Sequence, residues 1–437
     1  MYAVINGGVI PNGSVRVSGA KNSATRLLAA ALLTADIVEL GNFPTRLVDV
    51  GHKINFCRGI GVAISIDDEV EQLTIDASQM QSERLTREQY DVPIRTTYLL
   101  AAAQLMRFGV ARIPYPGGCP IGGGSGGARG YDLHIMVWNS LGATVTEHSD
   151  HIEIVADRLV GGRIDFPIST VGGTENALLC AAVASGTTEV FNAYITPEVD
   201  DLIALLRRMG ADIDVFGTSH IIVRGRADGL AGARMEVMSD RIEALTWIVY
   251  AILSKGDVTI DRVPFSAMQV PLLHLEHAGV DFLRNSTSIR ITPECLKLGA
   301  VQPFELACGA HPGIISDMQA FYVMLALVGA GTSRVFDYRY PERIAFVDEL
   351  AKLVGGQHLQ AERGKIVIHG PARFVPGTAR STDLRGSMAA VLAALCAHGT
   401  STILDVHMAL RGYNNLEAKL VGLGAQIAVH DGQPDRD

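Results

Sequence analysis

Residues 27–33 read Leu27-Leu28-Ala29-Ala30-Ala31-Leu32-Leu33, with an apolar side chain at every position. Alanine and leucine are strong helix formers, so the run predicts a helix. A helix at a surface carries a polar stripe, and this run has none, which predicts a helix buried on all sides. After a break at Ala35-Asp36, the chain continues with strand-like residues as far as Leu40.

The same pattern, an apolar alanine-rich helix followed by a β-branched strand, returns along the whole chain. In five copies a glycine marks the break, where the end of a helix favours a residue that tolerates positive φ. These glycines are Gly109, Gly186, Gly256, Gly331 and Gly399. The six copies span Leu28 to Leu40, Leu99 to Ile113, Leu178 to Phe191, Val249 to Ile260, Tyr322 to Phe336 and Val391 to Leu404.

A second glycine pattern lies between the copies of the first. Each of its glycines ends another helix-like segment and precedes alternating residues that suit a strand. They recur at intervals of roughly seventy residues. They are Gly61, Gly142, Gly210, Gly279, Gly355 and Gly424. Together the two patterns predict six α/β units, which divide naturally into two domains of three.

The predicted fold class is therefore α/β, with two domains that each hold three repeated α/β units. The helices of the first pattern are buried at the centre of each domain and mixed sheets cover them, an inside-out α/β barrel. Thr144-Val145-Thr146 and His151-Ile152-Glu153-Ile154, on either side of His148-Ser149-Asp150, indicate one of the hairpins. The alternative is a solenoid in which the units stack in one row, although solenoid repeats are usually shorter.

Composition limits the class of protein. The 437 residues are 48% hydrophobic and 19% charged, which is typical of well-packed globular domains. The 37 basic and 46 acidic residues give a net charge of −9, so we expect no nucleic-acid partner and no anionic membrane surface as partner. No run is long and apolar enough to span a bilayer, and no signal peptide is evident.

The six cysteines show neither a metal-ligand spacing nor the density of a disulfide scaffold. We therefore expect reduced thiols and a cytoplasmic location. The sequence does not indicate an oligomeric state. The cysteines are Cys57, Cys119, Cys180, Cys295, Cys308 and Cys396.

Cys119 differs from the other five because it lies between glycine clusters, Pro116-Gly117-Gly118 before it and Gly122 to Gly127 after it. So many glycines exclude a regular element and indicate an exposed loop. Arg129 follows closely, and a nearby cation is one condition for a reactive thiolate. The alternative is a loop cysteine without a chemical role.

Basic residues recur in the loops before the predicted helices. Lys21 lies at a loop-to-helix junction, where free N–H groups and the helix dipole favour an anion. Asn22 or Ser23 beside it suits a helix N-cap equally well. Arg95, Arg385 and Arg411 occupy comparable places, so the four groups are candidates for one anion site, although each alone resembles a surface charge.

Candidate proton acceptors are fewer. Asp317 lies where the fifth central helix should begin, either as an N-cap or as a carboxylate that faces a site. Asp240-Arg241 and Glu342-Arg343 look like the adjacent charge pairs of ordinary surfaces. No Walker A motif or dinucleotide fingerprint is present, so nucleoside triphosphate and NAD chemistry are unsupported.

These motifs, in this order, resemble the enolpyruvyl transferases, in particular those whose acceptor is UDP-N-acetylglucosamine. The resemblance covers nearly the whole chain. Its carriers are Ser18-Gly19-Ala20-Lys21-Asn22, Pro116 to Gly122, Asp132-Leu133-His134-Ile135, Val171 to Asn176, Asp240 to Glu243, His311-Pro312, Asp317-Met318-Gln319, Thr382-Asp383-Leu384-Arg385 and Arg411-Gly412-Tyr413.

The resemblance implies two domains joined by two chain crossings. Residues 21–237 would form one domain with the cysteine loop as a lid, and residues 1–20 with 238–437 the second. Phosphoenolpyruvate and a uridine nucleotide would bind between them, and no metal or organic cofactor is needed.

By position, the resemblance implies a role for each site residue. Lys21, Arg129 and Arg411 would bind the phosphate of phosphoenolpyruvate and Arg343 and Arg385 its carboxylate, with Arg95 also at this end. Cys119 would be the general acid or covalent partner, Asp317 would take the proton of the acceptor hydroxyl, and Asp383 would assist at C3. The nucleotide contacts would be Asn22, Arg129, Asp132, Leu133, His134, Thr170, Val171, Gly172 and Asp317.

The chain departs from the family pattern mainly at the acceptor end. Extra glycines and a serine follow Cys119, Ile168 stands where the family carries a lysine, and Leu410 replaces an aspartate. We expect transfer of enolpyruvyl to UDP-N-acetylglucosamine in peptidoglycan precursor synthesis. The alternatives are transfer to another nucleotide, such as UMP in nucleoside-antibiotic synthesis, and a catalytically silent binding homologue.

Overall fold

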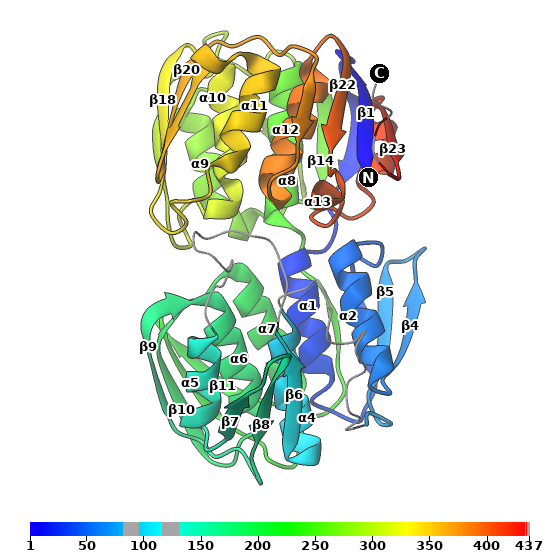
Figure 1. The fold of residues 1–437 in the computed structure, drawn as a ribbon, viewed down its shortest axis with the longest axis vertical. Helices are drawn as coiled ribbons and strands as arrows, with labels where there is room; N and C mark the ends of the chain where they lie inside the picture. Colours follow the sequence, from blue (N-terminus) through cyan, green and yellow to red (C-terminus); the bar gives the residue numbers. More distant parts are fainter. Residues whose placement is uncertain (82–95, 116–130, 433, 435–437) are drawn as a thin grey trace. The chain divides into compact units, whose positions relative to one another are not determined.

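The computed structural model describes residues 1–81, 96–115, 131–432 and 434. These residues form two compact units (Figure 1). Unit 1 consists of residues 1–18 and 239–432, and unit 2 of residues 19–81, 96–115 and 131–238. Each unit has its own hydrophobic core, which excludes a single row of stacked repeats.

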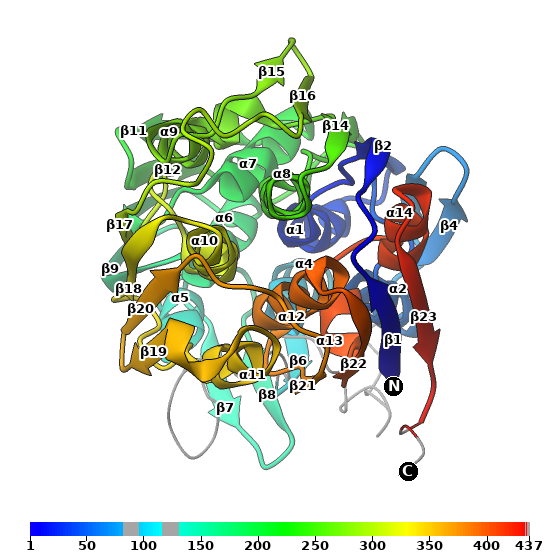
Figure 2. The same cartoon turned by 90° about the horizontal axis from the view of Figure 1, so that it is seen from above.

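Three central helices form the core of each unit, as the apolar runs predict. Every residue of α10 is buried, and in α8 every residue except the last is buried. Burial of one leucine side chain contributes about 1.5–3 kcal/mol, so these helices dominate the stability of each unit. Figure 2 shows α8, α10 and α12 nearly end-on, with strands around them. The central helices are α1 (Lys21–Ala31), α4 (Ala101–Phe108) and α6 (Val171–Ala182) in unit 2, and α8 (Arg241–Ser254), α10 (Gln319–Leu327) and α12 (Leu384–Cys396) in unit 1.

A second helix follows each central helix and is only partly buried. These helices are α2 (Val48–Gly59), α5 (Asp132–Ser140) and α7 (Pro197–Arg208) in unit 2, and α9 (Gln269–His277), α11 (Ala345–Val354) and α14 (Leu416–Gly422) in unit 1. Shorter helical turns connect the elements. They are α13 (His407–Leu410) and the 3₁₀ turns η1 (Thr96–Leu100), η2 (Phe265–Ala267), η3 (Ser316–Met318) and η4 (Gly356–His358).

Three sheets surround the central helices of each unit; all three are mixed in unit 1, and in unit 2 two are mixed and the described strands of the third are antiparallel, which confirms the predicted fold class. Five of the six sheets contain one parallel pair of strands at one edge and two antiparallel pairs. In unit 1 the orders are β21(Thr378–Arg380)-β22(Gly399–Leu404)-β1(Tyr2–Gly7)-β23(Gln426–His430), β15(Leu283–Arg284)-β16(Ser288–Ile291)-β14(Asp257–Asp261)-β2(Asn12–Arg16) and β17(Glu305–Cys308)-β18(Gly331–Asp337)-β20(Lys365–Gly370)-β19(Leu359–Glu362). In unit 2 they are β11(Asp212–Phe216)-β12(His220–Arg224)-β10(Thr187–Ala193)-β9(Arg163–Thr170), β13(Arg234–Glu236)-β3(Val38–Gly41)-β5(Gln72–Asp76)-β4(Ala63–Asp67) and β6(Val110–Pro114)-β8(His151–Val155)-β7(Thr144–Glu147).

The strand topology explains why the candidate site residues lie at the N-terminal ends of central helices. Strands β9, β17 and β21 each lead into a central helix, and the strand after that helix returns parallel to them. This βαβ arrangement puts the N-terminal end of each helix beyond the carboxyl end of the preceding strand. The loops that carry the candidate residues therefore lie at the N-terminal ends of these helices, where the positive ends of the helix dipoles and the free N–H groups are.

The glycines behave largely as predicted. The six glycines of the second pattern all have φ between 84° and 95°. Gly256 is an exception among the first set, because the positive φ of 53° belongs to Lys255. Glycine is required at 256 for another reason: a Cβ there would lie 2.6 Å from Pro11 Cγ and 2.8 Å from its carbonyl oxygen. In the part of the chain that the structure describes, no helix has the length and apolar character needed to cross a membrane.

Candidate functional site: charged clusters at the helix N-termini

In unit 1, acidic residues cap two of the central helices. The Asp240 carboxylate accepts hydrogen bonds from the backbone N–H groups of Ile242 and Glu243, at 2.8 and 3.1 Å. The Asp383 carboxylate accepts from Arg385 and Gly386, at 3.1 and 3.3 Å. Such caps satisfy N–H groups that have no partner within the helix. The motifs therefore fix the first turns of α8 and α12, from which Arg241 and Arg385 project.

A buried network of charges connects α10, α11 and α12. Arg343, two residues before α11, lies 2.7 Å from Asp317 Oδ1 and 2.9 Å from Asp383 Oδ1. Arg385 Nε lies 3.5 Å from the other oxygen of Asp317. Two guanidinium groups thus face one carboxylate. The Asp317 side chain is 28% exposed, whereas that of Arg385 is 2% exposed, so Asp317 is the accessible member of the network.

The carboxylates keep both arginines charged despite their burial. Burial opposes the charged form of Arg343, but Asp383 and Asp317 outweigh it and raise its pKa above the ordinary value. Burial likewise opposes the charged form of Arg385, and Tyr413, Asp317 and Asp240 together raise its pKa. An opposite charge within a few ångströms has this effect because it stabilises the ionised form. The network is therefore a fixed pair of cations suited to a carboxylate or a phosphate.

Arg411 follows α13 in the loop that carries Gly412 and Tyr413. Arg385 Nη1 donates to the Gly412 carbonyl at 3.4 Å, and its guanidinium lies 5.4 Å from the centre of the Tyr413 ring. The Tyr413 hydroxyl is 2.8 Å from Thr246 Oγ1 on α8. The loop is thus held by its glycine and tyrosine, and Arg411 Nη1 itself contacts Met408 Sδ at 3.9 Å.

Two predictions about unit 1 were wrong. Asp240-Arg241 and Glu342-Arg343 were interpreted as surface pairs, yet Asp240, Arg241 and Arg343 are all buried. Adjacent opposite charges look the same in sequence whether they lie on a surface or in a core. Only Glu342 behaves as predicted, with an ion pair to Arg363 at 2.5 Å on the surface.

In unit 2, Lys21 is the first residue of α1, and its ammonium group lies 2.7 Å from Asp49 Oδ2 on α2. Neither Asn22 nor Ser23 caps the helix, because the N-cap position is Ala20. Ser23 instead donates a short hydrogen bond to Asp201 on α7. The sequence analysis did not predict Asp49 as the partner of Lys21. Its position in the first turn of the next helix, α2, could have indicated it.

Two of the predicted nucleotide residues of unit 2, His134 on α5 and Gly172 at the start of α6, lie close together. Thr170 caps α6 by accepting a hydrogen bond from the Gly173 N–H at 3.3 Å. A Cβ on Gly172 would lie 2.6 Å from the Tyr98 hydroxyl and 3.3 Å from His134 Cε1. The rings of Tyr98 and His134 lie 3.7 Å apart between centroids.

Tyr98 was not predicted as part of this region. Both it and His134 are buried, so these rings shape the wall behind Gly172. Val171 follows Thr170 at the start of α6, and Asp132 and Leu133 occupy the first turn of α5.

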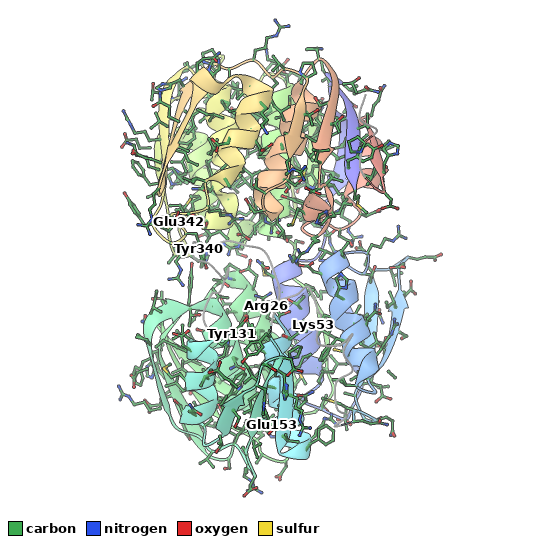
Figure 3. All side chains as sticks on the ribbon, viewed as in Figure 1. Arg26, Lys53, Tyr131, Glu153, Tyr340 and Glu342 are labelled. Atoms are coloured by element: carbon green, nitrogen blue, oxygen red, sulfur yellow. The ribbon has the colours of Figure 1, made fainter. Side chains whose placement is uncertain are left out.

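A second buried cluster in unit 2 was also missed. Arg26 Nε on α1 lies 2.8 Å from Glu175 Oε1 on α6, and the other oxygen of Glu175 is buried without a hydrogen-bond partner. The Lys53 ammonium on α2 donates to the carbonyl of Thr25 and, at 3.3 Å, to that of Thr96. Burial lowers the pKa of Lys53 to about 7. Figure 3 labels both basic residues.

The sequence carried a signal for this cluster. Arg26 immediately precedes the apolar run of α1, where a charge needs a partner, and Lys53 lies one helical turn beyond Asp49.

Three predicted site residues, Cys119, Arg95 and Arg129, lie outside the described residues. At the positions that depart from the family pattern, Ile168 on β9 is 54% exposed, and Leu410 ends α13 in a partly buried position.

Comparisons with known proteins agree with the fold and the motifs. Residues 6–420 match the family model described as EPSP synthase (3-phosphoshikimate 1-carboxyvinyltransferase). A UDP-N-acetylglucosamine 1-carboxyvinyltransferase from Sphingopyxis alaskensis is 36% identical and covers 97% of this chain and 98% of its own length. The enzyme of that name from Chlorobium phaeovibrioides is also 36% identical, with 97% of each chain covered.

Among solved structures, the enolpyruvyl transferase NikO from Streptomyces tendae matches with a TM-score of 0.88 and 26% identity, covering 98% of each chain. An EPSP synthase from Acinetobacter baumannii matches with a TM-score of 0.72 and 17% identity, over 98% of this chain and 99% of its own, and shows the shared fold. Near-complete coverage in sequence and structure leaves one conclusion: the chain belongs to the EPSP synthase family of enolpyruvyl transferases.

Proposed function

We propose that this protein transfers the enolpyruvyl group of phosphoenolpyruvate to the 3-hydroxyl of UDP-N-acetylglucosamine and releases phosphate. This reaction is the first committed step of peptidoglycan precursor synthesis. The full-length relatives named UDP-N-acetylglucosamine 1-carboxyvinyltransferase support the acceptor. The observation that carries the proposal is the network of Asp317, Arg343, Asp383 and Arg385 at the beginnings of α10 and α12.

The network supports a specific role for substrate binding. Asp317 now lies where a substrate carboxylate would meet Arg343 and Arg385. When phosphoenolpyruvate supplies that carboxylate, it competes with Asp317 for both guanidinium groups. Asp317 then loses two stabilising cations, its proton affinity rises, and it becomes a better base for the acceptor hydroxyl. Binding of one substrate would thereby prepare the base for the other.

The proposed reaction proceeds by addition and elimination. The acceptor oxygen attacks C2 of phosphoenolpyruvate as its proton passes to Asp317, while a proton from Cys119 adds to C3. The result is a tetrahedral ketal that carries both the phosphate and the acceptor oxygen. Loss of a C3 proton, assisted by Asp383, then breaks the bond between C2 and the phosphate oxygen. Lys21, Arg129 and Arg411 would stabilise the departing phosphate, with Arg95 also contacting phosphoenolpyruvate.

The acceptor would bind through unit 2. Asn22 at the start of α1, Asp132 to His134 on α5 and Thr170 to Gly172 at the start of α6 are the proposed contacts, together with Arg129 and Asp317. The N-terminal end of α6 offers free N–H groups to an anionic nucleotide. Glycine at 172 lets the backbone approach Tyr98 closely, because any larger residue would collide with its hydroxyl.

A second acceptor is favoured by one position. Ile168 is exposed on β9, two residues before Thr170, where the family carries a lysine that would face a diphosphate. An apolar residue there fits an acceptor with fewer phosphates, such as UMP. The high TM-score to NikO, itself an enolpyruvyl transferase, is compatible with this alternative.

We place the reaction in the cytoplasm, because the described cysteines are all free thiols, as in a reducing compartment.

Phosphate release from phosphoenolpyruvate, with UDP-N-acetylglucosamine and UMP offered in parallel, tests the proposal. Release with the sugar nucleotide at the higher kcat/KM supports the proposed acceptor. Release with UMP alone would replace it with the second candidate. Phosphoenolpyruvate binding without release in either mixture would indicate a silent homologue and overturn the proposal.

A further inference from the structure

A cluster of metal-ligating side chains lies on the β7–β8 hairpin of unit 2. It consists of His148, His151 and Glu153, which we call the hairpin histidine cluster. Glu153 is labelled in Figure 3. No step of the proposed reaction uses these three residues.

The register of the hairpin sets their arrangement. Thr146 pairs with Glu153 and Glu147 with Ile152, which places His148 opposite His151 at the turn. The His148 N–H donates to the His151 carbonyl at 2.9 Å and closes that turn. Side chains alternate between the two faces of a strand, and Ile152 lies in the core. His148, His151 and Glu153 therefore share the outer face.

The donor atoms are close enough to meet at one ion. One nitrogen from each histidine and one carboxylate oxygen all lie within 4.8 Å of one another. The two imidazole rings are stacked, with centroids 4.5 Å apart and an angle of 14° between their planes. His148 is exposed at the turn, so its ring has room to rotate onto an ion shared with His151.

Neighbouring groups orient two of the three ligands. His151 Nδ1 lies 2.7 Å from Asp150 Oδ1, which leaves Nε2 as the nitrogen that would coordinate an ion. A carboxylate bound to the second ring nitrogen is the usual support of a metal-binding histidine. Arg112 Nε donates to Glu153 Oε2 at 2.8 Å and holds that side chain against the sheet.

We propose that the hairpin histidine cluster binds a divalent late transition-metal ion, with Zn²⁺ as the best-suited ion. Two imidazoles and one carboxylate match the preference of Zn²⁺, Ni²⁺ and Cu²⁺ for nitrogen donors, whereas Mg²⁺ and Ca²⁺ prefer oxygen. Three protein ligands leave a fourth position of the zinc coordination sphere for water or for a side chain from another molecule. Because the ion would hold the turn residue His148 against His151 and Glu153 of β8 in the folded hairpin, it stabilises the native state.

Titration with Zn²⁺ by isothermal calorimetry tests this inference. The full-length protein is used without an affinity tag and with Cys119→Ser, so that neither a tag nor the loop thiol competes for the ion. One ion per chain is expected. His148→Ala and His151→Ala should each weaken binding by about tenfold or more, and Asp150→Asn by about 10–100-fold, as expected for loss of an orienting carboxylate.

A matched control and a second measurement separate binding from folding. His430→Ala removes an exposed strand histidine outside the cluster, at the end of β23, and should leave the Zn²⁺ affinity unchanged. The melting temperature of the parent should rise with Zn²⁺, and that of His148→Ala should not, while both melt alike with a chelator. Absence of binding, or binding that survives both histidine substitutions, would overturn the proposal.

Discussion

The two units place charged residues at the beginnings of their central helices in different ways. In unit 1, Arg343 joins Asp317 and Asp383, so that α10 and α12 share one network. In unit 2 the charges lie in two separate places, Lys21 with Asp49, and Arg26 with Glu175 and Lys53. The same repeat thus carries one network that links two central helices through a shared arginine in unit 1, and two separate charge clusters in unit 2. A repeated fold fixes where functional side chains can lie, and the side chains decide what each copy can do.

The largest expected effect is on turnover. Asp317→Asn removes the proposed base but keeps its size and its position beside Arg343. We expect kcat to fall by about 10²–10⁴-fold, the usual contribution of a general base. Phosphate release at saturating substrates measures it. The control is Asp257→Asn, which breaks a surface pair of unit 1, 2.7 Å from Arg290, and should leave kcat near the parent value. Equal losses in the two variants would argue against a base at 317.

The next prediction compares the units in stability. Arg343→Met leaves the carboxylates of Asp317 and Asp383 without their shared cation. We expect the free energy of unfolding to fall by about 3–5 kcal/mol. Arg26→Met should cost less, because the Lys53 ammonium still stabilises the Glu175 carboxylate. The chain has two tryptophans, Trp247 in unit 1 and Trp138 in unit 2, both buried.

Each tryptophan reports on its own unit. Urea unfolding is followed with Trp138→Phe for unit 1 and with Trp247→Phe for unit 2. If the cost of Arg26→Met equals or exceeds that of Arg343→Met, the contrast between a connected and an isolated cluster fails.

Lys53 makes a contribution to the stability of unit 2 that increases with pH. The pKa of its ammonium group is lowered from 10.5 to about 7 by burial. Between these values the unfolded chain binds more protons than the native one, so stability rises as the pH increases through this window. Below pH 7 the native state bears the full cost of a buried ammonium.

Lys53→Met removes this cost and the titration together. The free energy of unfolding of this variant should exceed that of the parent most near pH 6, by the order of a few kcal/mol, and the difference should shrink towards pH 9. Urea midpoints followed through Trp138 measure the trend, and a gain that grows with pH would contradict the sign.

The smallest effect concerns the acceptor. Ile168→Lys restores a cation beside the start of α6 and should lower KM for UDP-N-acetylglucosamine by about two- to fivefold, the scale of an exposed charge pair. KM for phosphoenolpyruvate should not change. Val160→Lys, another exposed apolar residue of unit 2, serves as control. A lower KM in both variants would indicate a general charge effect and no specific subsite.

Much of the fold could be predicted because it depends on local rules. Apolar runs, glycines that must adopt positive φ, and the Ser149-Asp150 turn each constrain their own neighbourhood. The site was less predictable because its partners come from distant parts of the chain. Nothing local to Arg343 shows that it lies between Asp317 and Asp383, and only the fold buries it there.

The central claim is that the chain makes an enol ether from phosphoenolpyruvate and UDP-N-acetylglucosamine. Proton NMR of a reaction mixture tests it most directly, because the product carries two vinyl protons on a group attached to the 3-oxygen of the sugar. The account predicts that these signals appear in step with phosphate release and are lost in Asp317→Asn. Phosphate release without new vinyl signals, or no turnover of phosphoenolpyruvate, would contradict it.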